Sequence, residues 1–165
     1  MQVIDLLINR LESSRGWTCG LLEDIEASDW FFQPAPGVQH VAWQVGHLAS
    51  SQVTLVHARC FGKTPTDHIP ARFKELFGKG SSPDDDPSLY PAPTEIRRVF
   101  DAVHSEALEL VRSISPDELD RPTAGDPHPM FTNKVQCIAM VSMHESFHAG
   151  QIALTRRILG KAPLR

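Results

Sequence analysis

Residues 134–159, KVQCIAMVSMHESFHAGQIALTRRIL, hold the pattern that decides the fold of this chain. Their apolar stripe has helical spacing and includes two histidines; it consists of Val141, His144, His148, Ile152, Thr155 and Leu159. Because His144 and His148 are four residues apart, both imidazoles lie on the helix face directed toward the protein interior. The pattern predicts a helix that begins at Thr132 or Asn133 and ends at Gly160.

Three further stretches show the same helical spacing. The first covers about residues 3–27 and is broken by the run DWFFQPAPG, because proline cannot continue a helix. The second covers about 39–61 and stops at Gly62, a typical C′ glycine. The third begins at Thr94, a predicted N-cap, and runs to Ile114, after which SPDEL adds a short helical turn.

A long connection rich in proline and aspartate separates the second and third of these helices. It covers residues 62–93 and contains one short helical candidate, residues 71–77. A connection of this length in a small chain favours a crossover or a lid over a tight turn. No segment shows the alternation of a strand, so we expect an all-α fold, a four-helix bundle, in a single domain over residues 1–165.

Composition excludes several classes of function. The chain has 165 residues, 41% of them hydrophobic, and a formal net charge of −4, so it has no basic excess for nucleic acid. No stretch approaches the roughly 18 apolar residues of a membrane span, and the first residues do not form a signal peptide. Three widely spaced cysteines form no disulfide framework, which favours a cytoplasmic location.

A third histidine, His47, turns the pair on the last helix into a candidate metal site. It lies in VAWQVGHLA, inside the second predicted helix, where it can also face the core. Three neutral imidazole nitrogens suffice to bind a divalent metal and leave coordination positions open, as in reactive sites. The alternative is that the histidines are core residues satisfied by hydrogen bonds.

Residues 144–148, HESFH, also match the H-E-x-x-H pattern of zinc proteases, in which Glu145 would be the general base. The sequence after His148, AGQIALTRRILGKAPLR, contains no Asp, Glu, His or Cys to supply a third ligand. No strand is predicted that could hold an extended peptide. A metallohydrolase of this type is therefore a remote alternative.

The combination of W-x-x-x-H-L at 43–48 with H-x-x-x-H-x-G-Q-I at 144–152 resembles the DinB/YfiT-like superfamily. The resemblance covers most of the chain and implies a four-helix bundle that binds a divalent metal, commonly zinc or nickel, through His47, His144 and His148. It also implies a thiol S-transferase or thiol-dependent isomerase that uses a low-molecular-weight thiol such as bacillithiol, mycothiol or glutathione. Where the family often has a small polar residue, this chain has Gln39-His40; His40 could contact the mouth of the pocket or cap the helix, and we favour the cap.

Three neighbours of the histidines are candidates for orienting them or a substrate. Gln151 lies one turn beyond His148, Trp43 lies one turn before His47, and Glu145 lies about 100° around the helix from His144. Four other histidines are predicted to be structural or solvated; they are His57, His68, His104 and His128.

The leading hypothesis is a metal-dependent enzyme whose small-molecule substrate enters where the 62–93 connection and the 121–131 loop meet the bundle end. Two alternatives stay open at this stage: a helical protein whose metal only stabilises the fold, and a stress-related bundle that binds a partner through its helix faces. The sequence also leaves open whether the protein forms a homodimer.

Overall fold

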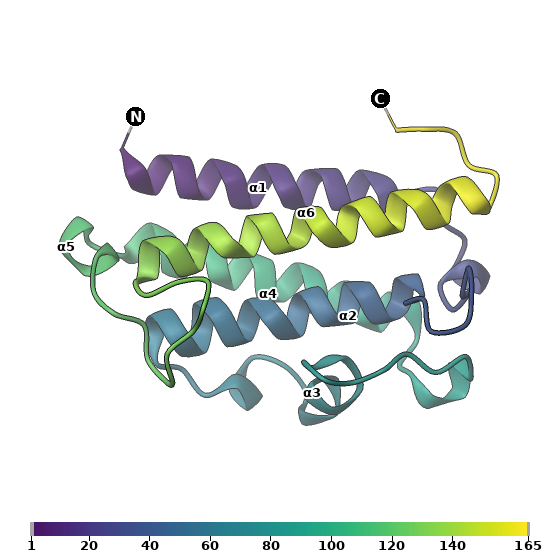
Figure 1. Ribbon diagram of the computed structural model, residues 1–165, viewed down its shortest axis with the longest axis horizontal. Helices are drawn as coiled ribbons and strands as arrows, with labels where there is room; N and C mark the ends of the chain where they lie inside the picture. The colour runs from purple at the N-terminus through teal and green to yellow at the C-terminus, as the bar shows by residue number, and fades with distance from the viewer. Residues whose placement is uncertain (1, 165) are drawn as a thin grey trace.

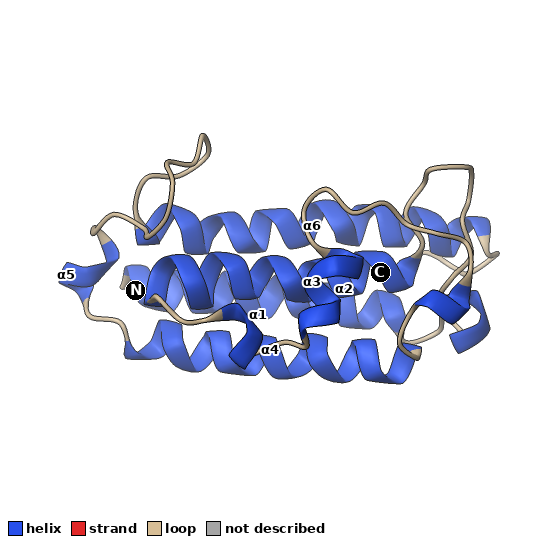
Figure 2. Cartoon of the chain, turned by 90° about the horizontal axis from the view of Figure 1, so that it is seen from below, coloured by secondary structure: helices blue, strands red, loops and turns tan. Residues whose placement is uncertain are grey.

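The computed structural model, which describes residues 2–164, consists of four long helices lying side by side (Figures 1 and 2). They are α1 (Val3–Leu22), α2 (Val41–Gln52) with its π-helical continuation η2 (Val53–Cys60), α4 (Pro93–Ser113) and α6 (Lys134–Ile158). Within residues 2–164 there is no strand, only two isolated β-bridges, which confirms the all-α prediction. None of the helices in that range has the length and hydropathy needed to cross a membrane.

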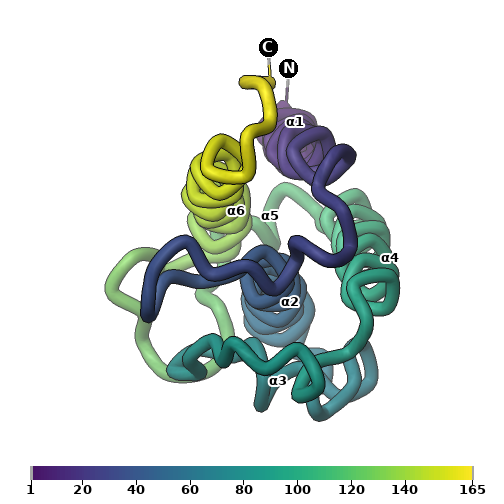
Figure 3. The backbone as a smooth tube through the Cα atoms, turned by 90° about the vertical axis from the view of Figure 1, so that its right-hand side faces the viewer, coloured from purple at the N-terminus to yellow at the C-terminus, as the bar shows by residue number. Residues whose placement is uncertain are grey.

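Short elements fill the connections between the long helices. They are η1 (Ala27–Asp29), η3 (Pro65–Asp67), α3 (Ala71–Phe77), η4 (Pro87–Leu89) and α5 (Pro116–Leu119). The predicted short helix at 71–77 is therefore present, inside the long connection, and SPDEL forms α5. Viewed from its end, the bundle has α3 and the rest of this connection outside α2 (Figure 3).

Capping side chains fix two of the helix starts, and three predictions about the helices need correction. His40 caps α2, because its Nδ1 accepts from the Trp43 N–H at 3.0 Å, and Asn133 caps α6. Thr94 is not a cap: α4 begins one residue earlier, since Pro93 suits the first helical position. The first helix ends at Leu22 rather than residue 27, and the last eight residues of the second are π-helical.

One buried cation, Arg15 on α1, contacts the other three long helices. Its Nε donates to Glu145 Oε1 on α6 at 2.7 Å, and its Nη1 donates to the Phe100 carbonyl on α4 at 2.7 Å. Its Nη2 donates to Gln52 Oε1 on α2 at 3.0 Å, and the guanidinium lies 3.3 Å from the centroid of the Phe100 ring. Arg15 and Glu145 are 6% and 1% exposed, so this ion pair lies in the core.

A glycine lets the long connection pack against α2. A Cβ on Gly46 would lie 2.5–2.6 Å from ring atoms of Phe77, closer than any side chain tolerates. Phe77 at the end of α3 is fully buried there, and the Trp43 indole N–H donates to Ser81 Oγ at 3.1 Å. The connection is thereby fixed against the face of α2 that carries His47.

We expect Glu145→Leu to lower the free energy of unfolding by about 3–5 kcal/mol, because it leaves the buried Arg15 charge unpaired. The double variant Arg15→Met/Glu145→Leu should recover most of that loss, since no charge then stays buried. Urea denaturation of the two variants measures both values. Arg112→Met, which breaks the half-exposed pair with Glu12, is the control and should cost less than about 1 kcal/mol. Equal effects of Glu145→Leu and Arg112→Met would contradict the core role of Arg15.

Candidate metal centre

His47 from α2 and His144 and His148 from α6 converge on one point. Each offers a ring nitrogen, and these atoms lie within 4.8 Å of one another. The Nε2 atoms of His144 and His148 are 3.2 Å apart, and the His47 ring centroid lies 5.2 Å and 5.1 Å from the other two. Tetrahedral ligands with metal–nitrogen bonds near 2.1 Å are about 3.4 Å apart, so the group has nearly the spacing that a metal requires.

Hydrogen bonds orient two of the three imidazoles. His47 Nδ1 lies 2.7 Å from the Phe77 carbonyl oxygen, and His148 Nδ1 lies 3.2 Å from Gln44 Oε1. Because these oxygens only accept, each Nδ1 carries the proton and each Nε2 has a lone pair. A metal bound by these two Nε2 atoms would replace their present contacts, which are with Ser51 Oγ and His144 Nε2. Metal-binding histidines in proteins are fixed in this way through their other ring nitrogen. The donor set therefore fits a divalent metal.

The surroundings keep the three imidazoles neutral. Burial lowers the pKa of His47, and burial followed by the His47 charge lowers the pKa of His144 to about 4. Burial and the charges of His144 and His47 lower the pKa of His148 to about 3. The Trp43 ring stacks on His47 with a centroid distance of 4.6 Å and an angle of 8° between the planes, so it forms one wall of the group. Neutral imidazole is the form that binds metal.

A groove of about 450 Å³ opens next to His47 and His144. Lys79 from the long connection and His128 and Phe131 from the 121–131 loop line it, so these two segments lie together beside the histidines. The groove extends along α2 and η2 from His47 to Arg59, and the entrance of a substrate at the bundle end stays a prediction. Two cations, Arg59 and Lys79, line it, and no acidic residue does.

Two of the predicted orienting residues lie elsewhere. Gln151 is exposed, and the amide beside His148 belongs to Gln44, which is fully buried. Glu145 faces away from the histidines, since its carboxylate binds Arg15. Gln44 could have been found as the one polar residue between Val41 and Gly46, in the turn before His47.

Apart from the histidine that caps α2, four other histidines lie outside the candidate centre. His104 is structural: it is buried and its Nδ1 accepts from Gln52 Nε2 at 3.2 Å. His128 stacks on Phe131 at the groove. His57 and His68, which the sequence left without partners, lie together with ring centroids 4.6 Å apart.

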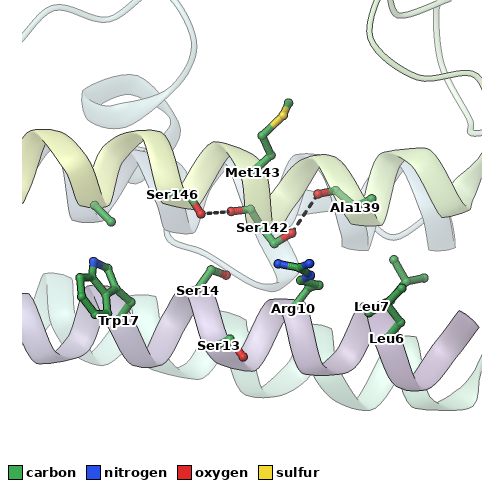
Figure 4. Close-up of a pocket in the computed structure, with 11 residues that line it drawn as sticks. Leu6, Leu7, Arg10, Ser13, Ser14, Trp17, Ala139, Ser142, Met143 and Ser146 are labelled. Carbon is green, nitrogen blue, oxygen red and sulfur yellow. Dashed lines mark hydrogen bonds between the residues drawn. The ribbon is translucent and has the colours of Figure 1, made fainter. Parts of the chain in front are cut away.

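A second groove, between α1 and α6, contains no candidate chemistry (Figure 4). Its volume is about 530 Å³, and serine hydroxyls, Arg10 and apolar side chains line it. The exposed side chains of Trp17 and Met143 lie on this groove, and Phe147 is exposed on α6 nearby. It holds no histidine and no carboxylate, so we assign the candidate centre to the three-histidine group.

Comparison with known proteins identifies the family and the fold of the chain. The family model described as DinB superfamily matches residues 10–152. A solved structure titled "Crystal structure of the conserved protein of locus from Enterococcus faecalis" is similar to the chain, with 18% identity and a TM-score of 0.67. The similarity covers 98% of this chain and 99% of that one. No curated protein matches the sequence.

The lowered pKa values predict that zinc affinity depends only weakly on pH. Three histidines with an ordinary pKa of about 6.5 would lose about a thousandfold in affinity at pH 5.5, because protons compete for each nitrogen. Here the pKa values of about 4 and about 3 keep His144 and His148 unprotonated at that pH. Competition titration with Zn²⁺ should therefore show less than about a tenfold loss between pH 7 and pH 5.5. A thousandfold loss would contradict the effect of burial.

Proposed function

The chain belongs to the DinB superfamily, and from this membership we propose that it is a metal-dependent enzyme with His47, His144 and His148 as ligands. The observation that carries the proposal is the convergence of three imidazoles, two of which have their Nδ1 bound to an oxygen acceptor. Zinc or nickel is the proposed ion, since imidazole suits both.

We propose that the reaction is a transfer or isomerisation assisted by a thiol. Three protein ligands leave a coordination position free, and a bound ion would lower the pKa of a thiol or water placed there. The chain's own contribution is to hold the imidazoles neutral and to direct His47 through the Phe77 carbonyl. The Ser51 hydroxyl, which hydrogen-bonds His47 Nε2 at 3.3 Å and lies in the groove wall, would be released for a substrate if a metal took that nitrogen.

The charges of the groove favour a thiol that carries carboxylates, such as glutathione or bacillithiol. Arg59 and Lys79 would attract an anionic group, and no lining carboxylate would repel it. Arg59 Nη2 donates to the Asp126 carbonyl at 2.7 Å and so fixes the side chain, while its Nη1 has no hydrogen-bond partner in the structure. Nη1 is itself buried, so the attraction proposed here is that of the Arg59 charge as a whole.

A bundle that binds a partner is a second candidate function. The exposed Trp17, Met143 and Phe147 of the α1 and α6 surface favour it, because large apolar side chains gathered on one face are typical of interaction sites. Homodimer formation and a cytoplasmic location both stay predictions. Thiol-dependent turnover by the metal-loaded protein would distinguish the enzyme from this alternative.

We expect His144→Gln to lose one bound zinc per chain and all thiol-dependent turnover, because it removes one of the three ligands. The variant should stay folded, since His144 is only half-buried and lies at the edge of the groove. Metal analysis and a turnover assay with glutathione, bacillithiol and mycothiol against chlorodinitrobenzene measure the two effects. Chelation should leave the far-UV circular dichroism unchanged, since the core contains its own apolar contacts. Gln151→Ala is the control and should retain zinc. Cooperative unfolding on chelation would show that the ion is structural.

Lys79→Gln should weaken glutathione binding about three- to tenfold, because one charge–carboxylate contact is lost. The Co²⁺-substituted protein permits the measurement, since thiolate ligation changes its visible absorption. The affinity for 2-mercaptoethanol, a thiol without charge, should not change. Lys74→Gln on α3, outside the groove, is the matched control. If Lys79→Gln lowered the affinity for glutathione and for 2-mercaptoethanol equally, Lys79 would not recognise the carboxylates.

A further inference from the structure

We propose a second metal site in this protein, formed by His57, His68 and Glu106. The ligand atoms of the three residues lie within 4.8 Å of one another. The group shares no residue with the His47 centre, and ten residues of helix, roughly 15 Å at 1.5 Å per residue, separate His57 from His47. It is therefore a separate site and does not depend on the proposed function.

Each ligand comes from a different element. His57 lies in the π-helix η2, His68 follows η3 at the beginning of the long connection, and Glu106 lies on α4. Single π-helical stretches inside α-helices are frequent at functional sites, because the added residue redirects the side chains that follow. Here η2 brings the His57 ring next to the ring of His68, with a centroid distance of 4.6 Å.

The buried imidazole of His57 is the independent sign of a missing ligand. Its side chain is 0% exposed, and neither ring nitrogen has a hydrogen-bond partner. The Nε2 atom lies 3.5 Å from Glu106 Oε2 without making a hydrogen bond. Leaving such a group unpaired inside a protein costs about 1–3 kcal/mol, so buried polar atoms without partners are rare. A metal ion between the three residues would satisfy this nitrogen.

The distances are close to those of a coordination sphere. His68 Nδ1 donates a hydrogen bond to Glu106 Oε2 at 2.7 Å, which an ion would replace, and ligands of a tetrahedral zinc lie about 3.4 Å apart. Side-chain movements of about 1 Å would therefore admit the ion. His68 and Glu106 are 19% and 46% exposed, so solvent reaches the site from one side.

The ligand set indicates the class of metal. Two imidazoles and one carboxylate select a divalent transition ion such as Zn²⁺ or Co²⁺ over Mg²⁺ or Ca²⁺, which prefer oxygen ligands. A pocket of about 260 Å³ leaves room for water as a further ligand; it is lined by Lys63, His68, Glu106, Glu109 and Leu110. Because His68 belongs to the connection and Glu106 to α4, the ion would fasten the start of the connection to the bundle.

The test is the number of Co²⁺ ions bound per chain, measured by equilibrium dialysis and elemental analysis. We expect two ions for the wild type and one for His68→Asn/Glu106→Gln, whose partly exposed side chains can change without a loss of folding. His144→Gln should also bind one ion, and the combined triple variant none. Glu95→Gln, an exposed carboxylate on the same helix as Glu106, is the control and should bind two.

The outcomes distinguish this site from the His47 centre. Loss of an ion in His68→Asn/Glu106→Gln but not in His144→Gln supports the second site and overturns the proposed three-histidine ligand set. Loss of a bound Co²⁺ ion in His144→Gln but not in His68→Asn/Glu106→Gln overturns the second site. An unchanged stoichiometry of two in His68→Asn/Glu106→Gln overturns it as well, and a wild type that binds no Co²⁺ overturns both.

Discussion

The buried guanidinium of Arg15 is the polar interaction that joins all four long helices of the bundle. A charge in the core is tolerated only when every donor finds a partner, and its partners here come from α2, α4 and α6. Glu145 must therefore face the centre of the bundle. Successive helical residues are about 100° apart, so this orientation of α6 turns His144 toward the groove beside α2. The ion pair and the candidate metal centre thus use neighbouring residues of α6 that point in different directions.

The same ion pair explains why the H-E-x-x-H match does not carry protease chemistry. In that chemistry the glutamate accepts a proton from water at the metal. Here the Glu145 carboxylate is 1% exposed and binds Arg15 at 2.7 Å, away from the two histidines that flank it in the sequence. The two histidines of the motif therefore face the candidate metal centre, whereas its glutamate faces Arg15.

The long connection between α2 and α4 supplies residues to the candidate sites as well as joining the two helices. At one point it supplies the Phe77 carbonyl that orients His47, and Gly46 makes this approach possible. At another it supplies Lys79 to the groove, and near its beginning it supplies His68 to the second group. A segment outside the bundle thus contributes to the groove and to both candidate metal groups.

The sequence by itself determined the helices, because the spacing of apolar residues follows from helix geometry, and it selected His47, His144 and His148 because they lie on inward faces. It could not place Gln44 beside His148 or assign Glu145 to Arg15, since those contacts join residues 104 and 130 positions apart. Nor could it pair His57 with His68 and Glu106. A π-helical stretch and the path of the connection bring them together, and both depend on tertiary packing.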